Sequence, residues 1–184
     1  NVLLIQPEGV DLYATLLKSD TSRGALRFYQ PDRLAYGICI RTASLGSALA
    51  LASELRWYIQ RYVEEVLFEP EEGIFCSSDL ARQIYERDVK PEHPWRYRCL
   101  YRIAGDHMVD TVWMDEGATP EAYADRTDPG DTVLEVWCAE EEYPAGRSGR
   151  GCAGLFKGPD VPLMLAYPEA IGSIDAHGSL PATR

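Results

Sequence analysis

Three arginines in one expected strand are the first side chains with the spacing for chemistry. Arg96, Arg98 and Arg102 alternate with apolar residues over 96–103, so a strand would point all three guanidinium groups to one face. Such a row can bind a phosphate or a carboxylate in bidentate geometry. We favour instead ion pairs within the sheet, since exposed pairs are common and usually structural. The expected partners are three carboxylates of the same region: Asp106, Asp110 and Glu135.

A glycine-rich segment over 146–154 holds two further anion-binding candidates, Arg147 and Arg150. Successive backbone N–H groups in such a loop can bind an anion. The spacing departs from the P-loop motif, because Leu155 follows Gly154 where that motif needs lysine. The local pattern resembles the glycine-rich loop of ferredoxin-like RNA-binding proteins of CRISPR systems, which implies an RNA or phosphate ligand. An ordinary surface loop is the alternative, and the acidity of the chain favours it.

A pair of serines and a downstream Glu-x-Glu motif supply candidate catalytic groups. Ser77 and Ser78 stand between a short expected strand and an expected helix, and Glu140 and Glu142 follow later in the chain. With Arg41 upstream, this order resembles the central part of the ADP-ribosyltransferase fold over about a third of the chain. The resemblance implies that Arg41 holds NAD, that the serines shape the NAD pocket and that a glutamate orients the attacked ribose. The alternative is a helix cap and a solvated acidic run.

Neither metal binding nor a preassembled nucleophile is indicated by the remaining reactive residues. The three histidines stand far apart, with no Cys or carboxylate at ligand spacing, so we expect no metal site and no cofactor. No Ser-His-Asp or Cys-His arrangement is suggested by spacing. The cysteines are odd in number and form no C-x-x-C pair, which is typical of reduced thiols in a cytosolic protein. They are Cys39, Cys76, Cys99, Cys138 and Cys152.

The negative charge of the chain is concentrated in its middle. The formal net charge is −11 over 184 residues, and residues 61–143 alone hold 21 Asp/Glu against eight Lys/Arg. Such a field repels phosphate backbones and anionic membrane surfaces, and it attracts cationic protein surfaces. Adjacent carboxylates in this region are therefore our candidates for partner binding, although each is also explained as a solvated face. They are Glu64, Glu65, Glu71, Glu72, Asp115 and Glu116.

The hydrophobic pattern predicts the elements that must position these groups. Over 44–68, apolar residues recur every three or four positions behind the capping residue Ser44, which predicts one long helix. A second helix is expected over 78–88, and residues 10–18 fit either a strand or a short helix. Residues 20–24 read as a turn, and 119–125 as one helical turn. Strands are expected at 2–5, 25–30, 34–42, 73–76, 96–103, 108–114 and 132–138.

These elements predict a single α+β domain. A mainly antiparallel sheet would pack on the long helix at 44–68, with the helix at 78–88 beside it. Residues 1–143 would form the core, and the glycine-rich residues 144–184 an irregular loop followed by a strap or tail. The sequence has no run of 18 apolar residues and no secretory-type leader, so we expect a cytoplasmic protein without a membrane span.

For function, we expect a non-enzymatic intracellular binding protein whose acidic middle docks onto a basic protein surface. Inhibitor and immunity proteins of bacteria or phages, including nucleic-acid mimics of the antirestriction or anti-CRISPR kind, fit this charge pattern. Carboxylates placed where a partner expects phosphates speed association and exclude the nucleic acid itself. The partner would then be a nucleic-acid-binding protein, with no direct contact to nucleic acid. An ADP-ribosyltransferase-like enzyme is the second hypothesis, and a phosphate or RNA binder using the glycine-rich loop is the third.

Overall fold

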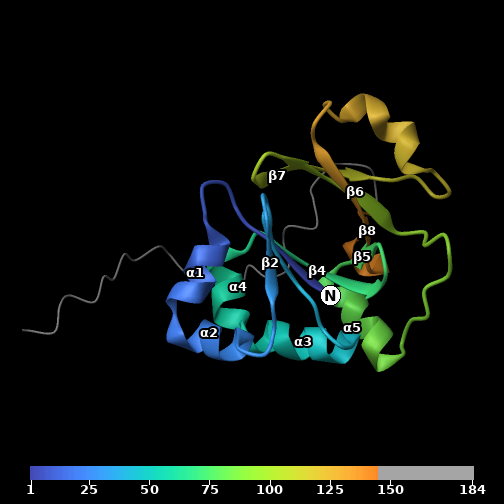
Figure 1. Ribbon diagram of the computed structural model, residues 1–184. Helices are drawn as coiled ribbons and strands as arrows, with labels where there is room; N and C mark the ends of the chain where they lie inside the picture. The colour runs from blue at the N-terminus through green and yellow to red at the C-terminus, as the bar shows by residue number, and fades with distance from the viewer. Residues whose placement is uncertain (145–184) are drawn as a thin grey trace, which may run out of the picture.

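The computed structural model describes residues 1–144, shown in Figure 1. Eight strands form one sheet in the order β2-β3-β1-β4-β5-β8-β6-β7. Each neighbouring pair is antiparallel except β5 and β8, which are parallel. The expected α+β class with a mainly antiparallel sheet is confirmed. The strands are β1 (Val2–Ile5), β2 (Pro31–Leu34), β3 (Gly37–Ile40), β4 (Glu65–Glu71), β5 (Ile74–Cys76), β6 (Arg98–Ala104), β7 (His107–Trp113) and β8 (Thr132–Trp137).

The α-helices lie together on one side of the sheet, and the first 3-10 helix lies at the opposite end of the molecule. Figure 1 shows α1 to α5 below the strands, while η1, in gold, stands beyond β6 and β7. The α-helices cover a core that includes Val2, Leu4, Val66 and Phe68. The helices are α1 (Leu12–Lys18), α2 (Asp20–Leu26), α3 (Leu45–Glu54), α4 (Arg56–Tyr62), α5 (Ser78–Glu86), η1 (Pro120–Arg126) and η2 (Glu140–Glu142).

The sheet curls so that its two halves face each other across a second core. On β1, Leu3 and Ile5 point away from the helices and belong to the same buried cluster as Tyr101 and Ile103 of β6. In a flat sheet, β6 would lie about 19 Å from β1, four strand spacings away. The amide of Gln6, directly after β1, nevertheless donates to the carbonyl of Asp106 in the β6–β7 turn at 3.3 Å, so the sheet is strongly bent. The outer face of β6 and β7 then packs under η1, through Leu100, Val112 and Met114.

The single long helix expected over 44–68 is wrong in its second half. Its first helix ends before Leu55, α4 covers only the next seven residues, and Glu65 already begins strand β4. The apolar residues from Val66 to Phe68 are buried on both faces of the sheet. A short apolar run of this kind fits the spacing of a helix and of a buried central strand equally well. Periodicity alone therefore predicted a helix where the structure has a strand.

The N-terminal third contains the other corrections. Residues 12–18 are helical, and the Asp11 carboxylate caps this helix by accepting a hydrogen bond from Ala14 N at 3.0 Å. The turn expected at 20–24 and the strand expected at 25–30 are wrong, because α2 occupies Asp20–Leu26. The aromatic residue Phe28, which suggested a strand, is exposed in the following turn. From β5 onward, each expected element is present within a few residues of its predicted bounds.

Candidate functional site

Two of the three predicted arginines, Arg98 and Arg102, share one face of β6, while Arg96 lies in the bend before the strand, and all three contact carboxylates. Arg98 is almost fully buried and lies 3.1 Å from Glu135, the partner anticipated from the sequence. Arg102 lies 3.2 Å from Asp128 and 3.6 Å from Asp131. Arg96 pairs with Glu116 at 2.9 Å, which raises the pKa of its guanidinium.

The two other expected partners make different contacts. Asp106 bonds His107 at 3.0 Å, and Asp110 accepts from the backbone N of Thr111 at 2.8 Å. Because the three arginines already hold internal carboxylates, the geometry favours the ion-pair interpretation of this row over a site for an external anion.

These arginines attach the long β7–β8 connection to the sheet. Arg98 donates from Nη2 to the carbonyl of Ala118 at 2.7 Å, near the start of the connection, and Arg102 holds its far end. Between them, Tyr123 packs on the outer core and its hydroxyl accepts from Asp115 N at 2.7 Å. The connection is thus fixed at both ends and in the middle.

The same connection is strongly acidic. Residues 115–131 carry six carboxylates and a single basic residue, Arg126. Glu121 and Asp125, on η1, are exposed and make no ion pair within residues 1–144. A hydrogen bond from Thr119 lowers the pKa of Glu121, so this carboxylate is charged at neutral pH. Figure 1 shows η1 projecting from the rest of the molecule.

The six carboxylates named from the sequence do not form one surface. Glu65 is buried at the start of β4, and Glu71 ends the same strand about 20 Å away. Glu71 also lies 3.5 Å from His93, while Glu64 and Glu72 are exposed at opposite ends of β4. Only Asp115 and Glu116 belong to the acidic β7–β8 connection. The sequence analysis missed the other carboxylates of this segment: Glu121, Asp125, Asp128 and Asp131. The signal that could have found them is the local charge count.

Two residues of the ADP-ribosyltransferase-like set come into contact. The Ser77 hydroxyl donates to Glu142 Oε2 at 2.5 Å and accepts from Leu80 N at 3.2 Å, as the cap of α5. Glu142 Oε2 also accepts from Ala139 N at 2.6 Å. Burial, together with the nearby Glu142 carboxylate, raises the pKa of the Cys76 thiol. The contact thus ties η2 to the first turn of α5 in a protected position.

The other members of that set point elsewhere. Arg41 pairs with Asp32 at 2.7 Å on β3, which lies three strand spacings, or about 14 Å, from β5. Ser78 faces the carbonyl of Val66 at 3.5 Å. Glu140 accepts a hydrogen bond from Tyr97 and thereby raises the pKa of that phenol. Arg41 is therefore separated from the Ser77–Glu142 contact by the width of three strands.

Several predictions concern residues 145–184, which lie outside the described residues; among them are Arg147, Arg150 and the glycine-rich loop. Within residues 1–144, no group of three or more His, Cys, Asp or Glu is placed to hold a metal ion. The helices of this part are too short or too polar to cross a membrane. Its four cysteines carry free thiols, and the sulfurs of buried Cys99 and Cys138 lie 3.5 Å apart.

Comparison with known proteins identifies a family whose function is unknown. The sequence model of a family of unknown function (DUF5804) matches residues 1–103, more than half of the chain. The matched part runs from β1 into β6 and contains the whole helix-covered side of the sheet as far as α5. The acidic β7–β8 connection and Glu142 follow after it. No curated protein and no solved structure matches the chain.

Proposed function

The chain belongs to a family of unknown function (DUF5804), and from the geometry of its described part we propose that it is a non-enzymatic binding protein whose acidic β7–β8 connection docks onto a basic protein surface. The observation that carries the proposal is a segment with five net negative charges, residues 115–131, that projects from the sheet and is held in place. Loops of this length inside a compact domain are usually functional.

The anchoring of the connection supports docking because a preorganised surface loses little conformational freedom on binding. Arg98 and Arg102 hold its two ends, and Tyr123 seats η1 on the outer core. Glu121 and Asp125 remain exposed on η1, and the carboxylate of Glu121 is charged at neutral pH. A basic surface would approach such a segment quickly at low salt, since opposite fields steer the encounter.

We also propose a class of partner and a cellular location. A surface that normally binds nucleic acid fits a segment of carboxylates, so an inhibitor or nucleic-acid mimic from a bacterium or phage is the form that we propose. The cytoplasm is the proposed location, supported by the free thiols of the described cysteines.

The test compares two charge-matched double variants. Glu121→Gln with Asp125→Asn removes two exposed charges from η1, while Glu54→Gln with Glu86→Gln removes two exposed charges from α3 and α5. Proteins captured by the unaltered chain from its native host would be identified, and their affinity for each form measured between low and physiological salt. We expect the η1 variant alone to weaken binding, about tenfold, and the unaltered affinity to fall steeply with salt. Equal losses in both variants, or a salt-independent affinity, would contradict the proposal.

An ADP-ribosyltransferase-like enzyme is the second candidate, and the Ser77–Glu142 contact at 2.5 Å is what favours it. We rank it lower because the Ser77 hydroxyl is engaged as a helix cap and Arg41 pairs with Asp32 three strands away. Calorimetric titration with NAD separates the two candidates. We expect no heat of NAD binding; a micromolar dissociation constant that Glu142→Gln leaves intact, with loss of ADP-ribose transfer in that variant, would reverse the ranking.

A further inference from the structure

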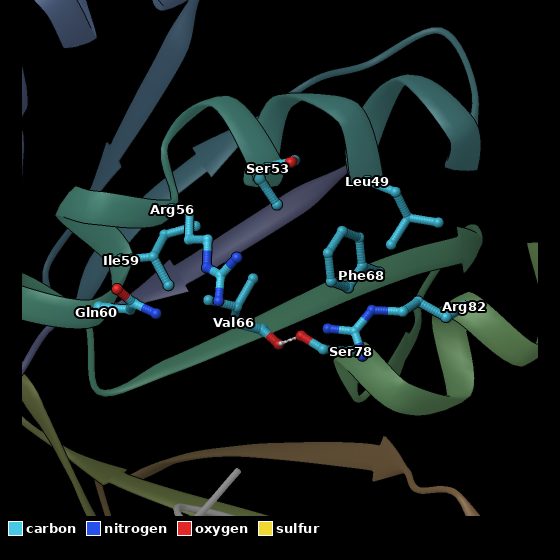
Figure 2. Close-up of a pocket in the computed structure, with 10 residues that line it drawn as sticks. Leu49, Ser53, Arg56, Ile59, Gln60, Val66, Phe68, Ser78 and Arg82 are labelled. Carbon is cyan, nitrogen blue, oxygen red and sulfur yellow. Dashed lines mark hydrogen bonds between the residues drawn. The ribbon is translucent and has the colours of Figure 1, made fainter. Parts of the chain in front are cut away.

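A pocket on the helix-covered side of the sheet, far from η1, has features of a small-molecule site. It lies between α3, α4 and α5 over strand β4, with a volume of about 390 Å³ (Figure 2). Ligand pockets typically measure about 300–1,000 Å³ and combine apolar walls with few polar groups. Here five of the ten lining residues are apolar and five are polar, and the part-exposed apolar side chains are Leu49 and Ala52.

The break between α3 and α4 creates this space. Leu55 leaves helical geometry, with φ −87° and ψ 4°, and buries its side chain in the core. The chain then starts a new helix at Arg56, at the edge of the pocket. At the other end of α3, Gly46 lies against the ring of Tyr85 on α5, where a Cβ would come within 2.8 Å of Cε2. The two helices therefore pack closely at Gly46 and leave the pocket open near the helix break.

Two arginines enter the pocket from opposite walls. Figure 2 shows Arg56, from α4, and Arg82, from α5, extending toward the middle of the pocket on either side of Phe68. Arg82 pairs with Asp79 at 2.7 Å. Within residues 1–144, Arg56 makes no hydrogen bond and no ion pair. The positive charge of Arg56 is therefore not neutralised by an ion pair within the described residues, in a chain of net charge −11.

We propose that this pocket binds a small organic carboxylate with an aromatic or branched apolar body. The carboxylate would lie between Arg56 and Arg82, whose planar forks match its two oxygens. The apolar body would lie against Leu49 and Ala52, above the buried ring of Phe68. A monoanion matches the charge of Arg56, which has no ion pair within residues 1–144, whereas a phosphate monoester carries nearly two charges and would face the Asp79 carboxylate.

This site is independent of the proposed docking segment. All the residues that line it lie between 49 and 82, inside the stretch that defines the family, whereas the acidic connection begins after residue 113. The helices and the sheet separate the two places. Failure of one proposal therefore leaves the other standing.

The ligand class is tested with three matched probes on the full chain. 2-Naphthoate carries the aromatic body and the carboxylate, 2-naphthalenemethanol the body alone, and acetate the carboxylate alone. Calorimetry should give a dissociation constant below about 1 mM for 2-naphthoate and at least about tenfold weaker binding for the other two. Equal binding of the alcohol would mean apolar contact without anion recognition and would overturn the proposal, as would inorganic phosphate binding more tightly than 2-naphthoate.

The position of the site is tested with single arginine variants. Arg56→Gln should weaken 2-naphthoate binding about tenfold or more, because it removes one charged donor and no contact within the described fold. Arg82→Gln should do the same, while Arg41→Gln, a paired and exposed arginine on β3, should leave the affinity unchanged. Unchanged binding in the Arg56 variant would refute the site. Backbone amide shifts on adding 2-naphthoate should cluster at residues 52–60 and 78–82 and not on η1.

Discussion

Ser77 has two roles at a single atom, and the structure makes them separable by experiment. Its hydroxyl oxygen caps α5 through Leu80 N, and its proton goes to Glu142. The capping role was predictable from a Ser-Ser-Asp sequence before an amphipathic helix. The contact with Glu142 joins residues 65 positions apart, and only the resemblance to a known family placed the two in one set. Arg56 could not be identified as a binding residue from the sequence, because nothing distinguishes an isolated arginine in an expected helix from other surface residues.

The first prediction compares two serine caps. Ser77→Ala removes a cap and the bond to Glu142, whereas Ser44→Ala removes the cap of α3, where Ser44 accepts from Ser47 N at 3.1 Å, and an exposed hydroxyl contact with Ser47. We expect Ser44→Ala to cost about 1 kcal/mol of unfolding free energy. Ser77→Ala should cost about 1–2 kcal/mol more, because the carboxylate loses a charge-assisted donor in a buried position. Urea denaturation measures both, and equal losses would mean that the Ser77–Glu142 contact contributes nothing.

The second prediction concerns pH. A hydrogen bond from His107 to Asp106 raises the pKa of the imidazole above 6.5 and lowers that of the carboxyl. A group with a raised pKa in the folded state stabilises the fold fully below its unfolded pKa, and this contribution fades as pH rises through the folded pKa. Proton NMR of the His107 ring should therefore give a pKa above 6.5, and Asp106→Asn should lower it. A titration unchanged by that substitution would show that Asp106 is not the cause.

At the scale of elements, the chain was predictable where local signals agreed with each other. Helix α5 has a capping serine and a clear apolar face, and β6 to β8 alternate between turn residues. The helix predicted for residues 63–68 was wrong, because strand β4 is buried on both faces and therefore shows no alternation of apolar and polar residues. The pocket could not be predicted either. It depends on the helix break at Leu55, and the apolar stripe of the sequence continues across that position without interruption.

The third prediction tests that helix break. Leu55 is 1% exposed, and Leu55→Ala should cost on the order of 2–5 kcal/mol by leaving a cavity in the core. Leu49, which is only partly buried on the pocket wall, is the control, and Leu49→Ala should cost clearly less. Denaturant unfolding of the two variants gives the comparison. An equal cost would mean that Leu55 packs no better than the pocket wall and that the break is not anchored by its side chain.

For the whole molecule, the decisive feature is the bend that brings the two ends of one sheet together. It places Tyr101 of β6 in one buried cluster with Leu3 and Ile5 of β1, and it leaves Arg98 and Arg102 on the outer face, where they hold the acidic connection. The proposed docking segment is therefore attached to one half of the sheet and the proposed ligand pocket to the other. Sequence patterns predicted most of the strands, though not β2 or β4, and they did not predict the bend, because side-chain alternation is the same in a flat and a curled sheet.

Gln6 links the two halves, and the last prediction concerns this residue. Its amide nitrogen donates to the carbonyls of Ala35 at 3.2 Å and of Asp106 at 3.3 Å, and its amide oxygen accepts from Leu12 N at 3.3 Å. One side chain thus joins the end of β1 to the β2–β3 turn, the β6–β7 turn and the start of α1. Since Gln6 is only 8% exposed, its side chain has little access to water as a substitute partner.

Two nearly isosteric variants separate the roles of the Gln6 amide. Gln6→Glu keeps the acceptor for Leu12 but turns a carboxylate toward two carbonyl oxygens, so it should destabilise the fold at neutral pH by about 2–4 kcal/mol. Protonation of the new carboxyl at low pH restores a donor, so the deficit relative to the unaltered chain should shrink as pH falls. Gln6→Met keeps the length without donors and should show a deficit that pH does not change. Hydrogen exchange of the β6–β7 amides should quicken in both variants. If only α1 and the β2–β3 turn respond, Gln6 supports one half of the sheet and the bend is held by the apolar core alone.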